Sequence, residues 1–191
     1  GSKVVRQHPV TKRSRRGSPL GGILLLACSC LLLATGASLR SEKLKAAYVF
    51  NFLKFTHWPA TPRTKPVLTL CLANADSALE EAFSTLDGRQ VNDQRISVYR
   101  LASLKEAAGC QVFYLQQGGA PISLHQLSRR NPGLLTIGDD ENFLQQGGII
   151  QLVEEQNRLQ FDINLTQLQQ ADFNISAQLL KLARNARSSA Q

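Results

Sequence analysis

The stretch from Lys45 to Pro59 constrains the fold more than any other part of this sequence. It holds five aromatic side chains, including the only tryptophan of the chain. On a helical wheel Lys43 and Lys54 fall on one side, and most of the remaining positions are apolar. Because Pro59 disfavours a helical conformation at Trp58, we expect a helix that ends near this tryptophan. The pattern predicts a helix buried on most of its circumference that supplies a large share of the core.

The first 37 residues have the three parts of an export signal. A basic segment that ends at Arg16 precedes an apolar run from Ile23 to Ala34, and small residues follow up to Ala37. Residues 1–37 are therefore predicted to be a cleavable signal peptide, with 38–191 as a single exported domain. An uncleaved membrane anchor is the alternative, although the run is shorter than the roughly 20 residues that a span needs.

The leader also explains the net charge of +8. It carries six basic residues and no acidic one, which leaves 16 basic against 14 acidic residues in the rest of the chain. A nucleic-acid partner is therefore not expected, because the basic character does not belong to the domain.

Removal of the leader would leave two cysteines, Cys71 and Cys110. In an exported protein such a pair favours a disulfide over a metal site, and two buried free thiols are the alternative. On the chain-entropy model, a link that closes a loop of this length contributes about 4 kcal/mol.

Strands and helices alternate through the remaining sequence. The apolar patterns predict strands at 67–72, 95–100, 110–115 and 134–137 and a hairpin of 149–154 with 158–163. Helices are expected at 77–86 and 103–108, up to residue 130, and at 175–187, with a short helix or loop at 165–171. This order predicts an α/β fold: a three-layer sandwich whose mostly parallel central sheet carries an antiparallel edge hairpin and is flanked by helices.

No set of residues that could carry catalysis stands out. His57 and His125 have no suitably spaced partners, and no nucleophile-elbow or phosphate-binding sequence occurs. Asp139, Asp140 and Glu141 form the one acidic cluster, at a strand end where doubly wound folds place ligands. A catalytic or cation-binding role for this cluster competes with helix capping. We therefore expect no enzyme, no metal and no cofactor.

Five segments in order resemble motifs of the YfiR family: Leu44–Pro59, Leu134–Phe143, Gln146–Ile150, Phe161–Leu165 and Ile175–Ala183. The resemblance implies a periplasmic protein that binds the periplasmic portion of an inner-membrane diguanylate cyclase and represses it. Envelope or redox stress would release the cyclase, raise cyclic di-GMP and promote biofilm formation. Whether the chain forms a homodimer, and whether an outer-membrane lipoprotein is a second partner, is left open.

The expected partner surface lies where the hairpin runs into the polar segment after it. More apolar side chains occur there than a solvated loop needs, with plain core packing as the alternative: Phe161, Ile163, Leu165, Leu168 and Phe173. The competing function is a periplasmic module of a signalling system that senses a small ligand in a cleft beside Asp139 and Asp140.

Overall fold

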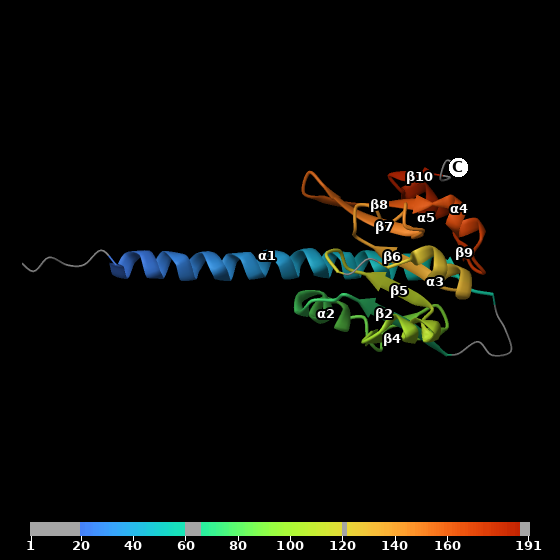
Figure 1. The fold of residues 1–191 in the computed structure, drawn as a ribbon, viewed down its shortest axis with the longest axis horizontal. Coiled ribbons are helices and arrows are strands. Elements are labelled where there is room, and N and C mark those ends of the chain that lie inside the picture. The colour runs from blue at the N-terminus through green and yellow to red at the C-terminus, as the bar shows by residue number, and fades with distance from the viewer. Residues whose placement is uncertain (1–19, 60–65, 120–121, 188–191) are drawn as a thin grey trace, which may run out of the picture. The chain divides into compact units, whose positions relative to one another are not determined.

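The computed structural model describes residues 20–59, 66–119 and 122–187, with the backbone alone for 20–36 (Figure 1). The chain divides into two compact units between Gly36 and Ala37. Every described residue of both core clusters lies at or after Ala46, so the core that the structure describes belongs to the compact unit from Ala37 to Gln191. Most of the predicted signal peptide lies outside the described residues. Within them, no helix combines the length and the apolar character needed to cross a membrane.

An eight-stranded sheet forms the centre of the second unit, in the order β10-β8-β7-β6-β5-β2-β4-β3. Neighbouring strands are parallel except in the pairs β3–β4 and β7–β8. The strands are β2 (Val67–Ala73), β3 (Gln90–Val91), β4 (Gln94–Arg100), β5 (Val112–Leu115), β6 (Leu135–Gly138), β7 (Ile150–Glu155), β8 (Arg158–Asn164) and β10 (Asn185–Arg187). The prediction of a mostly parallel sheet with an antiparallel hairpin is confirmed.

Helices cover both faces of the sheet, as a three-layer sandwich requires. Helices α1 (Leu20–Lys54) and α2 (Ser77–Ser84) contribute to one core cluster, and the 3₁₀ helix η1 (Leu104–Gly109) and α3 (Leu124–Arg130) contribute to the other (Figure 1). Strand β2 shows how the two clusters divide: Leu70 and Leu72 belong to the first, and Cys71 and Ala73 to the second. This alternation is the period of two that an extended strand imposes.

The predicted burial of the aromatic helix is confirmed, but the predicted end of the helix near Trp58 is wrong. In α1 Phe52 is almost fully buried, whereas Lys43 and Lys54 are exposed. The helix stops at Lys54 because the next residues form β1 (Thr56–His57), which pairs with β9 (Asn174–Ile175). Trp58 is half-buried: its ring packs on that of Phe173, with centroids 5.6 Å apart. Sequence periodicity does not register a two-residue strand, so β1, β3 and β9 were not predicted.

The helix predicted at 175–187 is also wrong in its extent. Helix α5 spans only Ala177–Leu182, and the chain then becomes β10, the sheet edge beyond the hairpin. The backbone N–H of Arg184 donates to the carbonyl of Phe161, and its guanidinium pairs with Asp162. These bonds to β8 hold the chain extended where its side-chain pattern alone predicted a helix.

The hairpin β7–β8 turns as its sequence suggests. Gln156 and Asn157 lie between the strands with φ of 49° and 62°. Two consecutive residues in the left-handed region are typical of the type I′ turn, whose twist matches that of the flanking strands.

Candidate functional site

The structure joins Cys71 and Cys110 in a disulfide, so the predicted pairing is confirmed. Cys71 lies in β2 and Cys110 follows η1, with their Cα atoms 6.0 Å apart. Both are buried, at 2% and 5% exposed. Of the six residues of η1 only Ala107 is buried. The disulfide is therefore the covalent attachment of η1 to the sheet, and its loss would leave the segment held by the packing of Ala107 and by the hydrogen bond that Asn131 donates to the Ala107 carbonyl.

The acidic cluster has a structural role. The carboxylate of Asp139 accepts a 2.6 Å hydrogen bond from Lys45 Nζ in α1 and another, 2.8 Å long, from the N–H of Gln117. Asp140 accepts from the N–H of Asn142 in its own turn. Because Asp139 is neutralised and its side chain is only 5% exposed, neither a cation site nor a ligand cleft beside it is supported. Only the contact of Asp140 within its own turn resembles the capping alternative, whereas Asp139 joins α1 to the turn after β5.

Asp139 belongs to a buried cluster with Lys45 and Glu42 of α1 and Tyr114 of β5. Lys45 Nζ also lies 3.0 Å from a Glu42 oxygen, so one lysine faces two carboxylates. Burial raises the pKa of Glu42 more than Lys45 lowers it. Burial alone would lower the pKa of Lys45, but the two carboxylates raise it. Burial also raises the pKa of the nearby phenol of Tyr114. The cluster ties α1 to the carboxyl ends of the central strands.

Sequence reasoning missed this pairing, although a signal was present. Lys45 lies in the first segment that resembles the YfiR motifs, and Asp139 in the second. The ammonium group of a lysine buried in a largely apolar helix needs a carboxylate as its counter-ion. That reasoning would have singled out Lys45.

The five expected partner residues divide into two groups. Phe161, Ile163 and Phe173 are at most 6% exposed and belong to the core, so a partner cannot reach them in this conformation. Core packing, the stated alternative, describes these three. Leu165 and Leu168 are half-buried on the next helix, α4 (Leu165–Gln169), and keep part of their surface open.

Helix α4 is held firmly at its start. The side chain of Asn164 accepts from the N–H of Gln167 and donates to the carbonyl of Leu144. In β8, Asp162 accepts two hydrogen bonds from the guanidinium of Arg184, of 2.7 and 3.1 Å. Burial would raise the pKa of Asp162, but Arg184 lowers it below the usual range. The strand that carries α4 is thus fixed to β10 by a charged link.

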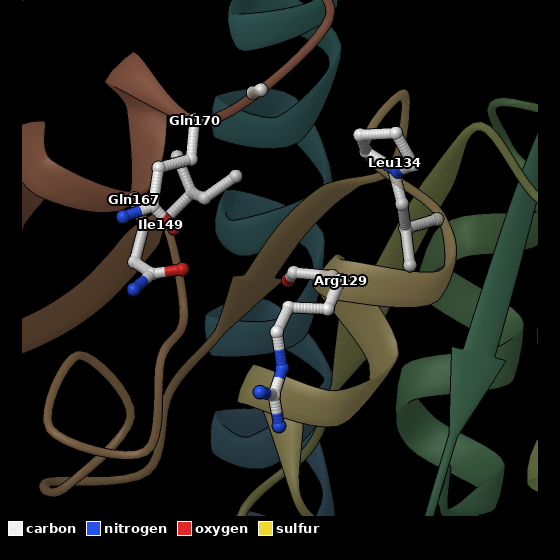
Figure 2. A pocket seen from close by; sticks show the side chains of 8 residues that line it. Arg129, Leu134, Ile149, Gln167 and Gln170 are labelled. Atoms are coloured by element: carbon white, nitrogen blue, oxygen red, sulfur yellow. The ribbon is translucent and has the colours of Figure 1, made fainter.

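A pocket of about 230 Å³ lies between α3 and α4. Figure 2 shows Arg129 projecting from α3, with Gln167 and Gln170 on the side of α4. The other residues that line the pocket are Ser128, Pro132, Leu134, Ile149 and Ala171. The side chains of Arg129, Gln167 and Gln170 form no hydrogen bond or ion pair with the described residues. No local pattern predicts this pocket, because its lining comes from four separate segments of the chain.

Metal chemistry has no support in the described part of the chain. His57 and His125 are exposed there, and no three histidine, cysteine or acidic side chains among the described residues are placed to hold a metal ion.

The comparisons with known proteins give one match. The sequence pattern of the YfiR/HmsC-like family matches residues 42–184, which is most of the chain and includes Lys45, both cysteines, Asp139 and α4. No curated protein matches it. On this match, the chain belongs to the YfiR/HmsC-like family.

Proposed function

We propose that this protein is a periplasmic repressor that binds the periplasmic portion of a membrane diguanylate cyclase, lowering cyclic di-GMP and biofilm formation. Family membership carries the proposal, because the YfiR/HmsC-like family is one of periplasmic, non-catalytic regulators of diguanylate cyclases. The site chemistry is compatible with it: the buried charges and the disulfide hold elements together, and neither presents a reactive group to a substrate.

Helix α4 is the partner surface that we propose. Leu165 and Leu168 expose part of their apolar surface beside the exposed, polar Gln169. An apolar centre with a polar rim is the usual composition of a protein interface. Since Asn164 caps the helix, a partner would meet a preformed surface and lose little affinity to ordering.

The test compares charge substitutions at two leucines. Leu168→Glu should abolish both capture of the cyclase and its repression. Leu182→Glu on α5 is the matched control, because Leu182 is 64% exposed and should change neither. Leu168 also contacts the core, so Gln169→Arg, at an exposed position of the same helix, provides a variant that leaves the core intact.

Capture of the cyclase from membranes and the cellular level of cyclic di-GMP are the two measurements. If Leu168→Glu and Gln169→Arg both capture and repress like the wild type, α4 is not the partner surface. If the wild-type protein captures no cyclase while its unfolding curve shows that it is folded, the repressor role itself fails.

Release by redox stress would act through the disulfide. Reduction of Cys71–Cys110 would free η1 and lower the population of the binding-competent fold. Capture of the cyclase should therefore weaken in reductant. Capture that reductant leaves unchanged would make the link purely structural. A homodimer and an outer-membrane lipoprotein as a second partner stay predictions.

The ligand-sensing alternative is favoured by one observation, the pocket between α3 and α4. A guanidinium and two amides without described partners, above the apolar Leu134 and Ile149, suit a small carboxylate with an apolar body. A ligand there would contact α4 directly. Small carboxylates that raise the melting temperature of the wild type, but not of Arg129→Gln, would support this function; no shift at millimolar concentration would argue against it.

A further inference from the structure

The layer formed by η1 and α3 comes from the most one-sidedly charged part of the domain. Between residues 94 and 138 the sequence has a single acidic residue, Glu106, and five basic ones: Arg95, Arg100, Lys105, Arg129 and Arg130. The sequence from residue 38 onward is nearly balanced, so this excess is local.

Three of these basic side chains, on η1 and α3, have no ion-pair partner among the described residues. They are Lys105 on η1 and Arg129 and Arg130 on α3, and all three are exposed. Arg100 is different, because its guanidinium is 2.9 Å from Glu80 of α2, on the opposite face of the sheet. Lys105, Arg129 and Arg130 therefore lie together on the layer that η1 and α3 form.

Two large apolar side chains are exposed on the same layer as these cations. Tyr99 is 54% exposed and Leu104 is 42% exposed. Tyr99 stands opposite Cys71 in the β4–β2 register, which places its side chain on the sheet face that η1 covers. Leu104 lines a hollow of about 200 Å³ together with Lys105 and Arg130.

We propose that this face, defined by Tyr99, Leu104, Lys105, Arg129 and Arg130, docks on an anionic phospholipid surface. Its cations are spread over two helices and two separate hollows: Lys105 and Arg130 line one, and Arg129 lines the pocket beside α4. Recognition of one acidic protein segment would call for cations that converge in a single groove. A lipid surface is a plane of mobile head groups and matches dispersed cations without a preformed groove. Tyrosine is enriched at the head-group level of membranes, and leucine inserts just below it.

Co-sedimentation with vesicles tests the proposal on residues 37–191, the compact unit that contains every described core residue and leaves out the apolar run from Ile23 to Ala34. The vesicles are phosphatidylglycerol mixed with phosphatidylcholine, and phosphatidylcholine alone. Binding is expected only to the mixed vesicles and should fall as salt rises. Each Lys or Arg near such a surface is worth roughly a fivefold change in affinity. Arg129→Gln with Arg130→Gln should therefore weaken binding about 25-fold.

The matched control is Lys43→Gln with Lys54→Gln, which removes the same charge from the exposed stripe of α1 in the opposite layer. It should bind like the wild type. Tyr99→Ser with Leu104→Ser should also weaken binding, and its urea unfolding curve shows whether the fold survives.

Three results would overturn the proposal. The wild type could bind phosphatidylcholine as well as the mixed vesicles, or the Arg129/Arg130 variant could bind no more weakly than the Lys43/Lys54 control. Tight binding to polyglutamate without binding to vesicles would reassign the face to an acidic protein partner. The proposal does not depend on the repressor function.

Discussion

Replacement of Lys45 by methionine should destabilise the domain more than any other single change in the buried charge cluster. The substitution keeps the volume of the side chain and leaves Glu42 and Asp139, whose side chains are 8% and 5% exposed, without their counter-ion. Removing one partner from a buried ion pair costs about 3–5 kcal/mol. Against a typical unfolding free energy of about 5–15 kcal/mol, the variant should lose a large part of its stability.

Two further substitutions in the cluster should lower the unfolding free energy less than Lys45→Met does. Asp139→Asn keeps an acceptor for Gln117 and leaves Lys45 paired with Glu42, so we expect a loss of about 1.5–3 kcal/mol. Glu42→Gln keeps the oxygen that accepts from Lys45 and removes a charge whose second oxygen, Oε2, has no hydrogen-bond partner among the described residues. This variant should be as stable as the wild type at pH 7, or more stable.

Urea unfolding of residues 37–191 measures all three differences. Fluorescence of Trp58 reports the transition, because it is the only tryptophan and packs against Phe173. The reasoning is refuted if Lys45→Met unfolds within about 1 kcal/mol of the wild type, or if Glu42→Gln is as damaging as Lys45→Met.

The remaining predictions concern pH, the link between β8 and β10, and the disulfide. Burial raises the pKa of Glu42 above its ordinary 4.5, so the stability from its protonation is complete below about pH 4.5 and disappears as pH rises through the folded-state pKa. Between pH 4.5 and 7, the unfolding free energy should therefore depend less on pH for Glu42→Gln than for the wild type, as urea unfolding at several pH values would measure. Asp162 acts in the opposite direction: its lowered pKa contributes stability above its ordinary 3.8, which is lost as pH falls through the folded-state pKa. Arg184→Met should remove that contribution and lower the unfolding free energy by about 2 kcal/mol at pH 7; an unchanged midpoint in urea would contradict it. Cys71→Ser with Cys110→Ser opens a loop of 39 residues and should cost about 4 kcal/mol, measured against the oxidised wild type in the same urea series.

The fold could be predicted from the sequence wherever one pattern extends over a whole element. The strand at Val67–Ala73 is a continuous apolar run, and the aromatic face of α1 repeats over several turns. The failures occur where tertiary contacts override the local pattern. The helix expected after residue 182 gives way to β10 because Asp162, 22 residues earlier, binds Arg184. No local signal in the sequence reports such a contact.

The candidate site could be predicted in part, and for the same reason. Cysteine counting identified the disulfide, since only two cysteines follow residue 37, where the predicted signal peptide ends. Apolar content alone could not separate Phe161, which is buried in the sheet, from Leu168, which is half-exposed on α4. The pair Lys45–Asp139 joins residues 94 positions apart and required the topology to bring them together.

The rate of cyclic di-GMP synthesis in membranes that contain a candidate cyclase tests the central claim most directly. Purified protein, residues 37–191 in the oxidised form, is titrated into these membranes from the periplasmic side, with Leu168→Glu and Leu182→Glu in parallel. The repressor role predicts a saturable fall in the rate with the wild type and Leu182→Glu and no fall with Leu168→Glu. The account would be contradicted if folded wild-type protein left the rate unchanged at every concentration with every candidate cyclase tested.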